Sequence, residues 1–310
     1  MRSAYLETLS ELAAKDKNVL AMISDNGAIV YDDYRARFPN QYINAGISEA
    51  NMVGMAAGLA RRGKIPFAYT IGAFLAYRAY EFIMNDVCLQ NQNVKLVGIG
   101  AGCAYSLLGP SHHTIFDISA LRPLPNLTVF SPASPMEVKQ VVKAAYSING
   151  PVYIRLGTNR EAEIYTKDYP FEVGKAVTVH DGGDLTIIST GSIVSDALEA
   201  ARQLEADGIR ARVINIHTIK PFDSEAVIEA AKETGRILVV EEHSTDGGLG
   251  SIVADALVSC GIPVQFDRVG LTGFVDGYGT HMVLKEKNRI GVMEIQHRAE
   301  IMVKGKERIK

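Results

Sequence analysis

Short apolar runs alternate with longer amphipathic stretches along most of the chain, and this alternation limits the folds that it can adopt. Such a strand–helix alternation is typical of parallel sheets with helices on both faces, so the sequence predicts the α/β class. The predicted strands are 19–24, 65–69, 94–99, 127–130, 152–155, 184–189, 211–216 and 237–242, and the predicted helices are 49–62, 74–91, 135–147, 192–207, 223–234 and 250–260.

A break in composition divides the chain. Residues 158–183 are rich in Thr, Asp, Tyr, Pro and Gly, and the alternation restarts after them. We expect a linker there, followed by a strand that leads into a second domain. The length of 310 residues also suits two domains. We therefore predict two domains, residues 1–165 and 166–310, each a mainly parallel sheet with helices on both faces.

Composition excludes several classes of function. The net charge is −3 without a basic or acidic block, which argues against nucleic acid or a membrane surface as partner. No apolar stretch is long and charge-free enough to span a bilayer, and residues 1–7 indicate an amphipathic helix, not a signal peptide. The three cysteines lack metal-ligand spacing. We expect a cytoplasmic protein with reduced thiols and no metal site of its own.

Glu49 immediately precedes a run of small and apolar residues, 50–60. Such a run packs as a buried helix, so Glu49 lies at its N-terminus, where the helix dipole and free N–H groups favour an anion. A fully buried carboxylate needs a partner. Local sequence leaves two interpretations open: a helix cap that stays in water, or a functional carboxylate.

Ligands of open parallel sheets bind beyond the carboxyl ends of the strands. Three features follow predicted strands there: Asp25, the glycine-bearing loop 98–113 and Arg155. The loop matches no dinucleotide or P-loop fingerprint, and its pair His112–His113 is only an indication of catalysis. Arg155 could form a surface ion pair or anchor an anion.

Aromatic residues recur at helical spacing at Phe74, Tyr77 and Tyr80. They could form a core stripe, which we expect for one of the three, or a flat wall for a planar heterocycle. Arg78 lies between them and could be a surface charge.

Together and in this order, the segments resemble the C-terminal half of a transketolase, a member of the thiamine diphosphate-dependent transketolase family. The resemblance covers essentially the whole chain, and the ordered set of motifs is far more specific than any one of them. The motifs are Gly46-Ile-Ser-Glu49-Ala-Asn-Met52, the aromatic helix, Gly109-Pro-Ser-His112, the segment 124–133, Ile219-Lys-Pro-Phe-Asp223 and the segment 240–250.

The resemblance implies thiamine diphosphate as cofactor. Glu49 matches the family glutamate that hydrogen-bonds a ring nitrogen of the cofactor's pyrimidine, a part that requires the carboxyl to hold or share a proton. Phe74 matches the residue that stacks on the pyrimidine, with Tyr77 beside it, and Asp25 falls where the family has an acid near the cofactor. His112 matches the histidine that faces the substrate oxygen, suited to proton transfer or oxyanion stabilisation.

The resemblance also implies a partner. The family's other half holds the diphosphate and Mg²⁺ with a Gly-Asp-Gly segment, and this chain contains no Gly-Asp-Gly. The nearest string, Asp181-Gly-Gly-Asp184, lies in the wrong domain. We therefore expect an N-terminal transketolase subunit to supply the diphosphate-binding domain, in an α2β2 assembly.

Two departures from the family bear on the substrate. Counting back from His112, Leu108 falls where sugar-phosphate transketolases carry an aspartate that recognises a donor hydroxyl, and Gly100 where they carry a histidine near the acceptor phosphate. Arg155 matches a family arginine that contacts the phosphate. A hydrophobic residue in place of a hydroxyl-binding one changes specificity. We expect transfer of a two-carbon ketol unit from a ketose to an aldehyde, on a non-standard sugar.

Two alternatives stay open. One is half of a deoxyxylulose-phosphate synthase-like enzyme or the beta subunit of a 2-oxo acid dehydrogenase, either of which would release carbon dioxide from a 2-oxo acid. The other is a non-catalytic assembly subunit. Glu49, Phe74 and His112 argue against the second alternative, because a scaffold has no need of that trio.

Overall fold

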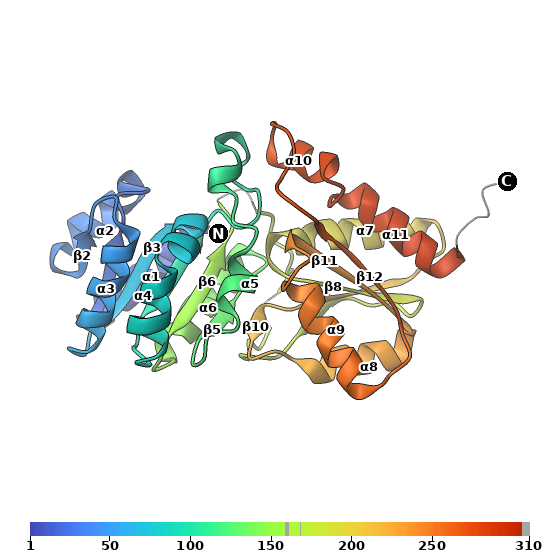
Figure 1. Ribbon diagram of the computed structural model, residues 1–310, viewed down its shortest axis with the longest axis horizontal. Helices are drawn as coiled ribbons and strands as arrows, with labels where there is room; N and C mark the ends of the chain where they lie inside the picture. Colours follow the sequence, from blue (N-terminus) through green and yellow to red (C-terminus); the bar gives the residue numbers. More distant parts are fainter. Residues whose placement is uncertain (159–160, 168, 306–310) are drawn as a thin grey trace.

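The computed structural model describes residues 1–158, 161–167 and 169–305, whose strands form two sheets, one of seven strands and one of five (Figure 1). Both sheets are mainly parallel and carry helices on both faces, so the predicted two-domain α/β fold is confirmed. No helix in the described part of the chain is long and apolar enough to cross a membrane.

The seven-stranded sheet has the order β10-β5-β6-β4-β3-β1-β2. All neighbouring strands pair in parallel except β10, which pairs antiparallel with β5. Central strands such as β1 are buried along their whole length, which suits their continuous apolar sequence. The strands are β1 (Val19–Ile23), β2 (Tyr42–Asn44), β3 (Ile65–Ile71), β4 (Lys95–Ile99), β5 (Thr128–Phe130), β6 (Val152–Leu156) and β10 (Thr218–Lys220).

Helices sandwich this sheet. On one face α1 packs against α6, which begins after Ser134, where the serine hydroxyl accepts the N–H of Glu137. On the other face α3 packs against β3 and the helical segment that follows it. The elements are α1 (Arg2–Lys15), α2 (Asp32–Arg37), α3 (Glu49–Ala60), η3 (Phe74–Arg78), α4 (Tyr80–Phe82), η4 (Ile83–Cys88), α5 (Asp117–Leu121) and α6 (Pro135–Ser147).

The five-stranded sheet has the order β12-β11-β8-β9-β7, with only β7 antiparallel. Helices α7 and α11 pack together over one face, and α8 and α9 over the other (Figure 1). The strands are β7 (Val177–His180), β8 (Leu185–Ser189), β9 (Ala211–Asn215), β11 (Arg236–Ser244) and β12 (Gln265–Leu271), and the helices are α7 (Val194–Ala206), α8 (Ser224–Thr234), α9 (Leu249–Cys260), α10 (His281–Lys287) and α11 (Val292–Lys304).

The two domains share a core. The apolar cluster under α3 continues through Ile216 and Ile219 to the residues of α8 and α9. The short strand β10 leaves the second half of the chain to join the edge of the first sheet. The N-terminus lies at the same junction, where the amino group of Met1 pairs with Glu161 at 3.0 Å. The domains are thus joined by packing as well as by the linker.

One predicted element differs from the structure. The sequence predicts a regular helix over 74–91, but the segment contains two π-helical stretches, η3 and η4, on either side of the single turn α4. Stretches with i→i+5 bonding change the angle between successive side chains and are frequent at functional sites. The spacing of the aromatic residues at 74, 77 and 80 is therefore not that of one regular face.

Candidate active site

A hydrogen-bonded junction fixes Glu49 at the edge of the first sheet. Ser24, at the carboxyl end of β1, donates its hydroxyl to the carbonyl of Gly46 at 2.8 Å. The same hydroxyl accepts the N–H of Ser48 at 2.9 Å. Because Glu49 is the first residue of α3, these bonds hold its backbone beside the strand end, where ligands of parallel sheets bind.

The carboxylate of Glu49 is buried. Glu49 is 2% exposed. Its Oε2 lies 2.8 Å from Nη1 of Arg78, and the side chain of Arg78 is 53% exposed. The interpretation of Glu49 as a cap that stays in water is therefore wrong, because the start of α3 is covered by the segment η3. Arg78, considered from sequence only as a surface charge, is the ion-pair partner of Glu49.

Phe74, Arg78 and His112 stand in contact next to Glu49. The guanidinium carbon of Arg78 lies 4.6 Å from the ring centroid of Phe74. The imidazole of His112 meets the same ring edge-on, with centroids 5.0 Å apart. The structure thus brings three predicted site residues together: a buried carboxylate, an aromatic face and a half-buried histidine.

The other two aromatic residues differ in their surroundings. Tyr77 is 40% exposed, and its hydroxyl accepts the N–H of Phe116 at 2.9 Å, which attaches η3 to the chain just after the glycine-bearing loop. Tyr80 packs against the core, which confirms the core interpretation for one of the three.

Asp25 lies at the strand end but faces solvent. It has a positive φ of 58°, a conformation that aspartate tolerates better than most residues. Its backbone N–H and its carboxylate form reciprocal bonds with the side chain of Asn44, at 3.1 Å and 2.9 Å. The contact ties the ends of β1 and β2 together and leaves an acid at the predicted ligand edge.

His112 lies in a loop that is closed at its base. Gly102 and Thr114 exchange backbone hydrogen bonds of 2.9 Å and 2.8 Å, so residues 103–113 form a closed loop. Nδ1 of His112 is 3.0 Å from the hydroxyl of Ser111. His113, for which sequence offered no role, is buried at the base of the loop, and burial lowers its pKa.

Gly100 and Leu108, the two departures from the family pattern, differ in their surroundings. Gly100 has φ +85°, and a Cβ there would overlap the ring of Tyr105, so a larger residue cannot stand at this position without moving the tyrosine. Leu108 is 53% exposed. It borders a cavity of about 610 Å³ between the loop and the second domain, whose lining includes Tyr105, Ser192, Thr280, His281 and Lys285.

Arg155 is not on the surface. It is 2% exposed, and its Nε lies 2.9 Å and 3.2 Å from the two carboxylate oxygens of Asp117. Its Nη2 donates to the carbonyls of Thr114 at 2.9 Å and Glu242 at 3.0 Å. The surface ion pair is therefore wrong, because the guanidinium is engaged inside the domain junction. The role of Arg155 as an anion anchor stays a prediction.

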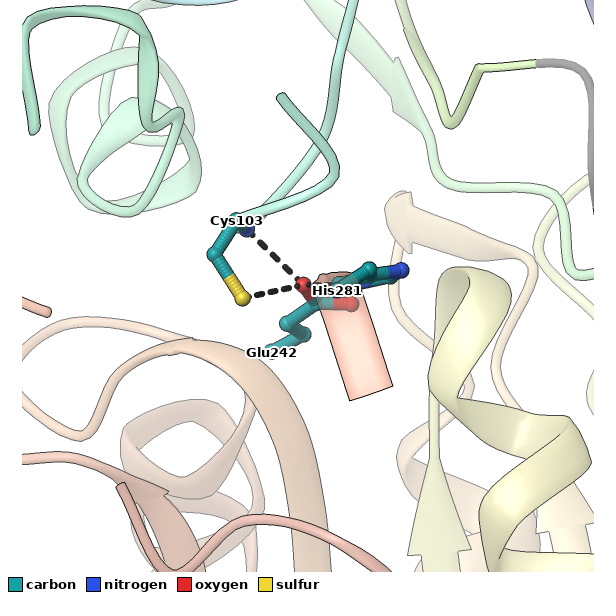
Figure 2. A group of neighbouring side chains, drawn as sticks. All are labelled: Cys103, Glu242 and His281. Atoms are coloured by element: carbon teal, nitrogen blue, oxygen red, sulfur yellow. Dashed lines mark hydrogen bonds and ion pairs between the residues drawn. The ribbon is translucent and has the colours of Figure 1, made fainter. Parts of the chain in front are cut away.

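A second cluster, which sequence reasoning missed, lies under the loop. Oε1 of Glu242 accepts hydrogen bonds from the Cys103 backbone at 2.8 Å and the Cys103 thiol at 3.1 Å, and lies 2.6 Å from Nε2 of His281 (Figure 2). Burial alone would raise the pKa of Glu242, but His281 and Lys285 outweigh it and bring the pKa to about 2. The charge of Glu242 in turn raises the pKa of His281.

These three side chains are also of the types that bind zinc, and their donor atoms lie within 4.8 Å of one another. Burial and the charge of Glu242 raise the pKa of the Cys103 thiol. The thiol of Cys103 thus retains its proton, and both Cys103 and His281 bond to the same oxygen of Glu242. These two hydrogen bonds to Glu242 therefore explain why the three side chains lie close together.

The fold is that of a known enzyme family. Residues 1–160 match the family description of the transketolase pyrimidine binding domain, and residues 174–287 match that of the transketolase C-terminal domain. The chain belongs to the transketolase family.

Its relatives include, more narrowly, subunits of split transketolases. The chain is 40% identical over 266 residues to one subunit of the apulose-4-phosphate transketolase of Phocaeicola vulgatus, covering 85% of each chain. It is 37% identical over 297 residues to the 6-deoxy-6-sulfo-D-fructose transketolase subunit SqwH of a Clostridium species, covering 95% of this chain and 92% of the relative. A solved structure described as a split gene transketolase, inactive beta4 tetramer, has 37% identity and a TM-score of 0.87 over 99% of this chain and 98% of that chain.

Proposed function

We propose that this chain is the C-terminal subunit of a two-chain transketolase that moves a two-carbon ketol unit from a ketose to an aldehyde with thiamine diphosphate. The observation that carries the proposal is the joint placement of the Glu49 carboxylate and the Phe74 ring at the strand edge, with His112 at the edge of that ring. Membership of the transketolase family supports it.

The residues present fit the pyrimidine of this cofactor. Such a ring needs a carboxylate at its nitrogen edge and an aromatic residue against its face. In the structure a planar, nitrogen-bearing group, the guanidinium of Arg78, makes both contacts at once, with Glu49 and with Phe74. A planar heterocycle can use the same two partners once Arg78, which is half exposed, turns away.

Each of the site residues of this chain then has its own proposed role. Thiamine diphosphate supplies an electron sink for cleaving the bond beside a carbonyl. Glu49 would share a proton with a nitrogen of its pyrimidine ring, Phe74 would support the face of that ring and Tyr77 would border it. Asp25 contributes an acid at the same edge. His112 holds or moves a proton at a substrate oxygen.

The diphosphate and Mg²⁺ are assigned mainly to a second chain. This sequence lacks a Gly-Asp-Gly segment, and its relatives are named as single subunits of a transketolase. We therefore propose an N-terminal transketolase subunit as partner, in an α2β2 assembly, with turnover only when both chains are present.

The substrate is proposed to be a non-standard sugar. Leu108 replaces a hydroxyl-binding residue with an exposed hydrophobic one, and Tyr105 leaves no room for a side chain at Gly100. The two relatives are named for apulose 4-phosphate and for 6-deoxy-6-sulfo-D-fructose, neither of which is a common ketose phosphate.

The test is reconstitution. The chain is mixed with the subunit from the same genome that carries the Gly-Asp-Gly segment, with thiamine diphosphate and Mg²⁺, and assayed on a panel of ketoses and aldehydes. We expect two-carbon transfer only when both chains are present. Carbon dioxide released from pyruvate would instead favour the synthase-like or dehydrogenase alternative. Turnover unaffected by Glu49→Ala would favour the assembly subunit.

A further inference from the structure

The loop that carries His112 is fastened at its base from both domains. On the first-domain side, Nη2 of Arg155 donates to the carbonyl of Thr114, one of the two residues that close the loop. On the second-domain side, the carboxylate of Glu242 accepts the N–H of Cys103, the first residue inside the closed loop. Arg155 also donates to the backbone carbonyl of Glu242, so the two fastenings are joined.

The fit between Glu242 and the loop is close. Gly102 has φ +62°, and a Cβ there would overlap the carboxylate of Glu242. The glycine therefore serves both the left-handed backbone and the approach of a side chain from the other domain. Because Glu242 is 2% exposed, water does not compete for the bonds that it makes to the loop.

The charge of Glu242 is balanced within the second domain. His281, the first residue of α10, lies 2.6 Å from the same carboxylate oxygen that bonds Cys103. Lys285, one turn later, pairs with Asp196 of α7 at 2.5 Å. Helix α10 is thereby fixed to α7 and holds the counter-ion of Glu242 in place. A buried carboxylate with a fixed cation and a fixed backbone donor has little freedom to move.

We propose that Glu242 is a positioning residue that sets the place of His112: its carboxylate, held by His281, fixes the backbone at Cys103 and hence the closed loop. It does not touch the reacting atoms and acts through the loop. The proposal rests on the proposed function only for the role of His112. The second domain, remote in sequence from the loop, thus contributes to the geometry of the reaction.

The first test uses the chain alone and does not depend on activity. Hydrogen exchange of the backbone amides of residues 103–113 is measured by mass spectrometry in wild type, Glu242→Gln and Glu241→Gln. Glu241 is the matched control, a buried glutamate on the same strand whose bonds go to the N–H groups of Leu249 and Gly250. We expect exchange in the loop to rise about tenfold or more in Glu242→Gln only. Equal exchange in the two variants would overturn the proposal.

The second test asks whether Glu242 acts through His112. In the reconstituted complex, turnover is measured for Glu242→Gln, His112→Ala and the double variant. We expect Glu242→Gln to lower kcat about tenfold or more with little change in the donor KM, and to have almost no effect when His112 is already alanine. A loss of the same size in both backgrounds indicates a general structural effect and overturns the proposal.

A second variant covers the case in which Glu242→Gln does not fold. Glu242→Asp keeps the charge but shortens the side chain, so that its oxygen withdraws from the N–H of Cys103, and it should raise exchange over 103–113 in the same way. Failure of the proposed function is recognised separately, because a wild-type complex without turnover leaves the exchange measurement on the chain alone unaffected.

Discussion

Glu49 is the residue on which the proposed chemistry depends most. It is buried at the start of α3 and pairs with the half-exposed Arg78, so movement of that arginine would open the carboxylate to a ligand. Glu49→Gln keeps the size of the side chain but removes the acid that exchanges a proton with the pyrimidine. We expect assembly to be unchanged and kcat of the complex to fall by about 10² or more. A kcat of the variant within about threefold of the wild-type value would contradict the role assigned to Glu49.

Leu108 is the residue at which specificity is tested. It lies exposed in the loop that carries His112, and we propose that it stands in place of a residue that binds a donor hydroxyl. Leu108→Asp restores a hydroxyl-binding carboxylate, so we expect kcat/KM for ordinary ketose phosphates to rise by about tenfold. The measurement is a competition among donors in a panel. An unchanged order of preference would contradict the assignment of Leu108.

The site residues that sequence could predict are those inside recognisable motifs. Glu49, Phe74 and His112 belong to such motifs, and the structure brings them together. Arg78 was missed as a partner because an arginine on a helix is usually a surface charge. Glu242 and His281 were missed because their partner, Cys103, is far away in sequence, and no local pattern reports such a contact.

At the scale of elements, one buried carboxylate, that of Glu137, connects α6 to the linker and to the second domain. Glu137 accepts hydrogen bonds from the backbone of Ala133 at 2.5 Å, from the hydroxyls of Tyr165 and Tyr169 at 2.8 Å and 2.5 Å, and from the amide of Asn215 at 2.9 Å. Burial raises the pKa of Glu137. The first turn of one helix thus organises a segment of irregular chain.

Glu137→Ala would leave these buried donors without an acceptor. We expect the free energy of unfolding to fall by about 3 kcal/mol or more, measured by chemical denaturation. Glu137→Gln, the matched control, keeps an oxygen acceptor, and its free energy of unfolding should fall clearly less. Equal losses in the two variants would show that the side chain contributes through its volume and not through its hydrogen bonds.

Elements were predictable where the sequence pattern was strong. Strand β1 is a continuous apolar run, and α6 begins at a serine cap followed by proline. The strand β10 was missed because three residues carry no periodic signal. No prediction covered β12, α10 and α11, and β12 mixes exposed and half-buried positions, as expected for an edge strand. The π-helical stretches in 74–88 have no sequence signature.

At the scale of the whole molecule, the contact of Glu242 with His281 links α10 to the junction between the domains. The pKa of Glu242 is lowered to about 2, so its stabilisation is present above its ordinary pKa of 4.5 and is lost as the pH falls toward 2. The pKa of His281 is raised, so its stabilisation is complete below 6.5 and is lost as the pH rises through the raised value. The pair therefore stabilises the fold most at about pH 5 to 6.

This pH dependence is open to a direct test. The thermal midpoints of wild type and His281→Gln are compared across the pH range. We expect the thermal midpoint of the wild type to exceed that of the variant most at about pH 5 to 6. The difference should shrink as His281 loses its proton. A difference that stays constant from acid to alkaline pH would mean that the contact contributes by packing alone.

The most direct test of the central claim is a native-mass measurement on this chain recovered from its own cells in the presence of thiamine diphosphate and Mg²⁺. The account predicts a complex with a second subunit that carries the Gly-Asp-Gly segment, with two copies of each chain and bound cofactor. Recovery of this chain alone, without cofactor, would contradict the claim and leave the chemistry of Glu49 without support.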